Sequence, residues 1–172
     1  MSRNTKIVMA AAAALLAAVA VFAWLNRGSV AEKKATQDSG TFLVTYGDIQ
    51  YTVSMEDIEA LDPRTIDANY KKSGKNPEPR QYTGVPLVSV FDFLGIDCSA
   101  ASSVSFTAAD GYASALPIAD ALDEESCYII IAEGGAPLGT KESGGSGPFM
   151  MILALDQFSQ RWCKFLMEVA VK

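Results

Sequence analysis

The stretch Tyr82-Thr-Gly-Val-Pro-Leu87 begins the most strongly patterned part of this 172-residue sequence. A proline in the first turn of a helix loses nothing, because the N–H that it lacks would have no partner there. Apolar residues then recur at helical spacing up to Gly95, a residue type that commonly ends helices. The stretch therefore predicts an amphipathic helix that starts at Val85 and Pro86.

Strand signals follow this helix. Alternating apolar residues at 104–108 lead into Asp110-Gly111, and residues 112–116 return, which predicts a β-hairpin. Pro117 starts a short helix that runs to Leu122. These signals place two strands and one helix between residues 104 and 122.

The last quarter of the chain predicts more strands. The apolar run 126–132 is typical of a central strand covered on both faces, and Gly134-Gly135 indicates a tight turn after it. Gly147-Pro-Phe-Met-Met-Ile-Leu153 predicts another strand. From Trp162 onward, alternation predicts a final strand with one face formed by Cys163, Phe165, Met167, Val169 and Val171.

The residues before the helix also have a readable pattern. Thr41 to Val53 alternates on both sides of Gly47-Asp48, which predicts a hairpin. Ser54 is placed to cap a short helix over Met55–Leu61, with a capping box to Asp57. Together these elements predict an α+β domain with a mixed, mostly antiparallel sheet of eight or nine strands and three short helices.

Two polar segments are expected to be irregular. Residues 62–81 contain three prolines and five basic residues, and predict either a solvated surface loop or a ligand-covering loop that supplies positive charge. Residues 139–148 contain four glycines and two serines. They predict either a flexible connector or a loop whose N–H groups cradle an anion beside Lys141.

The N-terminus predicts export. Residues 7–25 carry no charge and nine of these 19 are alanine, with Arg3 and Lys6 before them. This pattern is typical of a signal sequence or an uncleaved signal anchor over residues 1–25, with 7–25 contacting the membrane. Residues 26–40 read as a linker and 41–172 as the folded domain. The expected location is extracytoplasmic, either membrane-anchored or secreted.

Composition excludes several kinds of chemistry. After Leu25 there are 12 basic and 20 acidic residues, a net charge of −8, which argues against nucleic-acid binding. The chain has no histidine, so it cannot carry a Ser-His-Asp or Cys-His mechanism alone. Its three cysteines are too scattered for a zinc site, and leave open one disulfide or none. Cys127 and Cys163 are expected to be buried, and Cys98 is the cysteine expected to be exposed.

Taken in order, these signals resemble the molybdopterin-binding oxidoreductase domain of the sulfite oxidase family, over about residues 42–172. The pieces that carry the resemblance are Tyr82–Leu87, Phe106-Thr-Ala-Ala-Asp-Gly-Tyr112, Leu116-Pro-Ile-Ala-Asp-Ala-Leu122, Ala132-Glu-Gly-Gly-Ala-Pro-Leu138, Gly147–Leu153 and Arg161-Trp-Cys-Lys-Phe-Leu166. The resemblance implies the sulfite-oxidase-like molybdopterin-binding fold, in its short stand-alone form, and makes molybdopterin a possible cofactor.

In the catalytic members of that family, a cysteine thiolate before this helix binds molybdenum. The matching segment here, Thr65-Ile-Asp-Ala-Asn-Tyr70, has no cysteine. We therefore assign no catalytic and no metal-binding residue, and expect an accessory domain that binds an anionic small molecule or a protein partner. The alternative is a molybdopterin-dependent oxidoreductase with atypical metal ligation or a partner subunit. The expected cleft residues are Asn69, Arg80, Tyr82, Asp110, Tyr112, Lys141, Ser143 and Arg161.

Overall fold

The computed structural model describes residues 15, 21, 40–71, 74 and 76–172 of the chain. The expected signal segment and linker therefore lie almost wholly outside the described residues. None of the helices within the described ranges is long and apolar enough to cross a membrane. The account below concerns the compact unit formed by the described residues from Gly40 onward.

The first of two sheets joins strands from both ends of the domain. Its order is β2 (Ile49–Ser54), β1 (Thr41–Tyr46), β10 (Leu166–Val171), β5 (Ser103–Ala108) and β6 (Ala113–Pro117). Only β1 and β10 are parallel neighbours in this sheet. The strand β10 therefore lies at the centre of this sheet, between β1 and β5.

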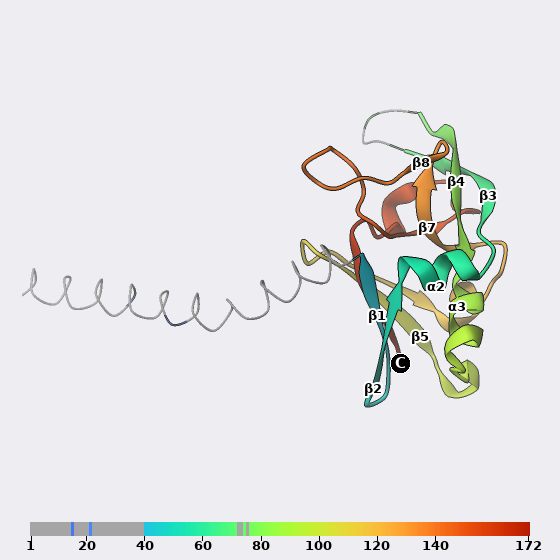
Figure 1. The fold of residues 1–172 in the computed structure, drawn as a ribbon, viewed down its shortest axis with the longest axis vertical. Helices are drawn as coiled ribbons and strands as arrows, with labels where there is room; N and C mark the ends of the chain where they lie inside the picture. The colour runs from blue at the N-terminus through green and yellow to red at the C-terminus, as the bar shows by residue number, and fades with distance from the viewer. Residues whose placement is uncertain (1–14, 16–20, 22–39, 72–73, 75) are drawn as a thin grey trace, which may run out of the picture. The chain divides into compact units, whose positions relative to one another are not determined.

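The second sheet is antiparallel throughout. Its order is β3 (Arg64–Tyr70), β4 (Glu78–Pro86), β7 (Cys127–Glu133) and β8 (Ala136–Pro137), and β9 (Met150–Leu153) also pairs with β7. In Figure 1 the labelled strands of this sheet lie at the top of the domain, and β1, β2 and β5 lie below them. Three short helices accompany the sheets: α2 (Met55–Ala60), α3 (Leu87–Leu94) and α4 (Ile118–Ala121).

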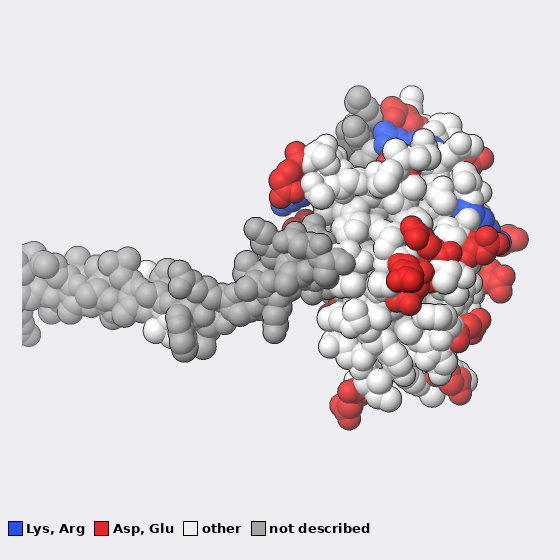
Figure 2. Space-filling model, viewed as in Figure 1, with Lys and Arg blue, Asp and Glu red and all other residues white. Residues whose placement is uncertain are grey.

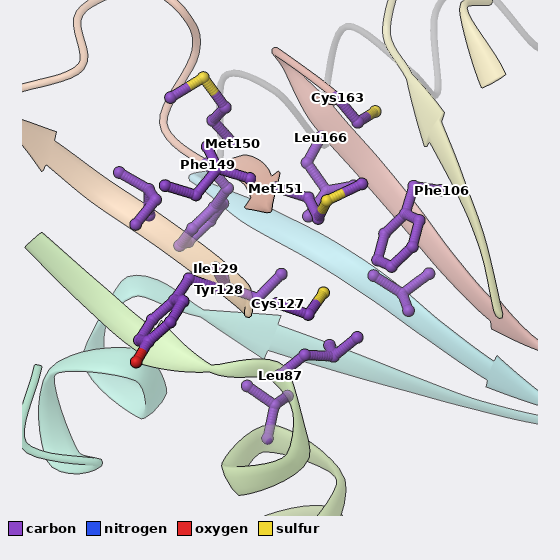
Figure 3. Packing of buried hydrophobic residues seen from close by; sticks show 14 of the residues in the cluster. Leu87, Phe106, Cys127, Tyr128, Ile129, Phe149, Met150, Met151, Cys163 and Leu166 are labelled. Carbon is purple, nitrogen blue, oxygen red and sulfur yellow. The ribbon is translucent and has the colours of Figure 1, made fainter. Parts of the chain in front are cut away.

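The core lies between the two sheets, and β9 is at its centre. All four residues of β9 are buried. The Phe149 ring before it packs edge-on against Phe42 of β1, with ring centroids 4.9 Å apart. Figure 3 shows β9 side chains among buried residues of both sheets, including Phe106, Ile129 and Leu166. Burial of this apolar surface is the main favourable term for folding.

The structure confirms the predictions that depend on short stretches of sequence, namely a hairpin, a helix cap and the end of a helix. The β1–β2 hairpin has its turn at Gly47, where φ is +60°. The capping box of α2 is present: the Ser54 Oγ accepts from the Asp57 N–H at 3.2 Å, and the Asp57 carboxylate accepts from the Ser54 N–H at 2.8 Å. The α3 helix begins at Leu87, one or two residues later than predicted, and ends at left-handed Gly95.

The prediction of an irregular loop over residues 62–81 is wrong, because most of this segment forms β3 and β4. The two strands pair from Arg64↔Gly84 to Tyr70↔Glu78. The polar composition misled because β3 is an edge strand, and only Ala68 is buried along it. An edge strand with one solvated face has no need of the apolar alternation that identifies an internal strand.

The predicted faces of the last strand are also partly wrong. Phe165 has a left-handed backbone with φ of +53°, and the register to β5 shifts between Leu166 and Glu168. These irregularities break the alternation, so that Leu166 and Trp162 are buried while Phe165 is only half-buried. Cys163 is buried, as predicted.

Gly84 is required by the close approach of β4 to β7. A Cβ atom at this position would overlap the Ile129 carbonyl oxygen and lie 2.8 Å from the Ile130 Cα. We predict that Gly84→Ala lowers the free energy of unfolding by about 3 kcal/mol or prevents folding, because backbone cannot yield as a flexible side chain can. Chemical denaturation followed by circular dichroism measures this.

Gly47→Ala is the matched control. Its Cβ would meet no atom within 4 Å, so only the left-handed backbone is penalised, by about 1 kcal/mol. Equal losses in the two variants would contradict the proposed close approach at Gly84.

Candidate ligand-binding site

Three aromatic side chains, from the last residue of β3, the middle of β4 and the segment before β10, form a fixed wall. Tyr82 of β4 packs edge-on against Trp162, with centroids 5.4 Å apart, and the Tyr70 and Trp162 rings are 6.0 Å apart. The Trp162 indole N–H donates to the Leu153 carbonyl at 3.3 Å. Burial, and next the charge of Glu133, raise the pKa of the Tyr82 phenol, so it stays protonated. The wall is therefore uncharged and held from several sides.

Two hollows lie against this wall. The large hollow has a volume of about 480 Å³, and its side chains include Tyr70, Arg80, Glu133, Ser146 and Lys164. The small hollow, of about 250 Å³, is lined by Ala108, Asp110, Tyr112, Gln160, Trp162 and Lys164. Lys164 is the residue that both hollows share.

Lys164 is held by Tyr70. Its Nζ donates to the Tyr70 hydroxyl at 3.2 Å and lies 4.8 Å from the ring centroid. The side chain is half-buried, and within the described residues it forms no salt bridge. A partly desolvated ammonium group that is not neutralised by a carboxylate is well suited to bind an anion.

Arg80, by contrast, is already neutralised. Its guanidinium binds the Glu133 carboxylate at 2.5 Å and the Glu78 carboxylate at 3.3 Å, and lies 4.3 Å from the Tyr70 centroid. Arg80 therefore shapes the wall of the large hollow, while Glu133 competes with any external anion for it.

The structure places the eight cleft residues expected from the sequence in several different parts of the domain. Arg80 lines the large hollow, Asp110 and Tyr112 line the small one, and Tyr82 supports Trp162. Tyr82 itself lines neither hollow, and the same holds for the remaining four, Asn69, Lys141, Ser143 and Arg161.

Exposure or local contacts account for three of the remaining four residues, and Lys141 lies exposed on the loop 139–148. Asn69 lies on the exposed face of the edge strand β3, and Ser143 donates to the Thr140 carbonyl at 2.9 Å. Arg161 is paired with Asp156 at 2.6 Å and with Asp120 at 3.6 Å. Arg80, Lys141 and Arg161 therefore do not line a common hollow.

Several lining residues were missed by the sequence reasoning, above all Tyr70, Glu133 and Lys164. The signal for Lys164 was present, since alternation puts it on the same strand face as Trp162. Tyr70 was hidden because the segment that contains it was taken for a loop. Only the pairing of β4 with β7, which matches Tyr82 with Glu133, brings Glu133 beside Arg80.

The loop 139–148 closes one side of the large hollow but does not offer its late amides to a ligand. The N–H groups of residues 144–147 donate to carbonyls within residues 138–141, at 2.8–3.1 Å. A Cβ at Gly145 would overlap the Leu138 carbonyl oxygen, so the turn needs glycine there. Those four amides are therefore unsuited to the anion cradle that the composition suggested.

The cysteines do not fit a thiolate-bound molybdenum. Cys127 and Cys163 are fully buried, and burial raises the pKa of both thiols, that of Cys163 to about 12. Cys98, which was expected to be exposed, is also buried, and lines a separate hollow beside α3. Across the described ranges, no group of three or more His, Cys, Asp or Glu side chains could hold a metal ion.

The architecture places the domain in a recognisable class of folds. It is α+β, with two mostly antiparallel sheets and few helices, and has the sulfite-oxidase-like molybdopterin-binding fold that the sequence predicts. A similar solved structure is the sulfane dehydrogenase SoxCD from Paracoccus pantotrophus, with a TM-score of 0.62 and 14% sequence identity. The match covers 78% of this chain but only 38% of the SoxCD chain, and at this identity it concerns the fold alone. No family model and no curated protein matches the sequence.

The buried thiols lead to a prediction about labelling. At neutral pH we expect iodoacetamide to modify Cys98 first, and Cys127 and Cys163 only on unfolding, because the reagent needs an accessible thiolate. Raising the pH toward 9 should speed modification of Cys98 and leave the other two protected. Mass spectrometry of tryptic peptides measures each site, and native-state modification of Cys163 as fast as that of Cys98 would contradict the burial described here.

Proposed function

We propose that this chain is an exported, membrane-tethered accessory module that binds a small anionic ligand where the two hollows meet, and does not itself catalyse a redox reaction. The observation that carries the proposal is Lys164. It is a half-buried cation, shared by both hollows and held by Tyr70 rather than by a carboxylate.

The electrostatics favour a single anionic group at this point. The Tyr70 ring covers one side of the ammonium and Trp162 lines the small hollow beside it, and partial exclusion of water strengthens the attraction of Lys164 for an anion. A hydrogen bond between charged groups contributes roughly 1.5–3 kcal/mol in such surroundings. The face of the domain shown in Figure 2 works against larger anions, because acidic side chains are spread over it and basic ones occur at few points.

Export and tethering are supported by the sequence. The uncharged run 7–25, preceded by Arg3 and Lys6, is the pattern of a signal sequence or anchor. The polar residues 26–40 would separate the domain from the membrane. The proposed location is extracytoplasmic.

The alternative is a molybdopterin-dependent oxidoreductase with atypical metal ligation or a partner subunit. The fold likeness to a protein described as a dehydrogenase favours it. Metal and pterin analysis of protein purified from its native host separates the two. Stoichiometric molybdenum with a pterin chromophore would overturn the accessory role.

Two substitutions at the site should act in opposite directions. We predict that Lys164→Gln weakens acetate binding to the full chain about tenfold, because it removes the charge that attracts the anion. Glu133→Gln should strengthen acetate binding severalfold, because it releases Arg80 toward the large hollow. Ligand-induced shifts in melting temperature, and calorimetry in mild detergent, measure both effects.

Lys172→Gln serves as the matched control, since it removes the same charge from an exposed position that lines neither hollow. If Lys164→Gln and Lys172→Gln weaken binding equally, the anion is attracted by overall charge, and the site assigned here is wrong.

A further inference from the structure

The small hollow contains an aromatic side chain that is exposed and yet held in place. Tyr112 is 41% exposed. Its hydroxyl donates to the Gln160 carbonyl at 2.8 Å, and its N–H donates to the Asp110 carboxylate at 2.9 Å. Exposed aromatic side chains usually keep rotational freedom that binding must remove, and here the ring is fixed beforehand.

Trp162 forms another wall of the same hollow. Its indole N–H is already used by the Leu153 carbonyl, and it is only 4% exposed. Trp162 therefore offers the hollow apolar ring surface and no donor. With Ala108 and the Tyr112 ring, it gives a space of about 250 Å³ whose walls suit a flat apolar group.

The charges set the direction in which a ligand would lie. Asp110 at the small hollow repels an anionic group, and Lys164 at its border with the large hollow attracts one. Deeper in the large hollow, the Glu133 carboxylate would also repel an anion, and it already forms a salt bridge with Arg80. The favourable place for a carboxylate is therefore at Lys164, with the remainder of the ligand in the small hollow.

We propose, on the basis of the function proposed above, that the ligand is a small aromatic carboxylic acid whose ring lies between Tyr112 and Trp162 and whose carboxylate binds Lys164. The proposal names a ligand class: one acidic group, one flat apolar group, and a short link between them. It assigns Tyr112 to the ring and Lys164 to the acid.

The test compares three probes by isothermal titration calorimetry of the full chain in mild detergent. Phenylacetate carries both groups, acetate only the acid, and benzyl alcohol the ring without the acid. We expect phenylacetate to bind about tenfold more tightly than either of the others, because it alone fills the ring space and reaches the ammonium.

Variants assign each half of the ligand. Tyr112→Ala should weaken phenylacetate about tenfold and leave acetate unchanged, whereas Tyr112→Phe, which keeps the ring, should retain most of the affinity. Lys164→Gln should weaken both acids, and Lys172→Gln neither. Circular dichroism and melting temperatures show whether each variant is folded.

The outcomes separate this inference from the function on which it rests. Equal binding of phenylacetate and acetate, or a Tyr112→Ala variant that binds phenylacetate normally, would overturn the aromatic class and leave an anion site at Lys164. Acid binding that is insensitive to Lys164→Gln, or no measurable binding of any probe, would overturn both.

Discussion

The structure depends on the strand β9 and its attachment to the segment that precedes β10. Met151 and Cys163 exchange two backbone hydrogen bonds of 2.9 Å, and the Leu166 N–H donates to the Phe149 carbonyl at 2.9 Å. β9 also pairs with β7 of the second sheet, while β10 belongs to the first. This junction therefore joins the two sheets, buries the core between them, and holds Trp162 at the small hollow and Lys164 at both hollows.

A backbone irregularity at Phe165 lies beside this junction. Phe165 is left-handed, a conformation that costs a residue other than glycine about 1–2 kcal/mol, and its N–H donates to the Ser146 carbonyl at 2.6 Å. A Cβ at Gly147 would lie 2.7 Å from the Phe165 Cα, so the two loops approach as closely as backbone allows. Lys164, the residue before Phe165, contacts Tyr70, and residues 144–146, which precede Gly147, line the large hollow.

Sequence reasoning succeeded where the signal was local. The capping box of Ser54 and Asp57, the glycine that ends α3, and the apolar run of β7 each depend on neighbours within a few residues. It failed for β3, whose polar edge carries no apolar pattern, and for the faces of β10, which a left-handed residue shifts. Five of the eight expected cleft residues line neither hollow: Tyr82 packs against Trp162, Arg161 is held by its ion pair with Asp156, and Asn69, Lys141 and Ser143 lie exposed.

By itself, the sequence determined the fold class, the order of most strands and helices, and the lack of histidine chemistry, since these follow from composition and short-range periodicity. It also determined that no cysteine lies on the segment Thr65–Tyr70. Only the tertiary structure decided which charges neutralise each other and which remain available at a cavity. In the sequence, Arg80 and Lys164 are simply two basic residues. In the structure, the Glu133 carboxylate of β7 pairs with Arg80, whereas the Tyr70 hydroxyl of β3 binds Lys164. That difference arises from contacts between residues far apart in the chain, which no local pattern contains.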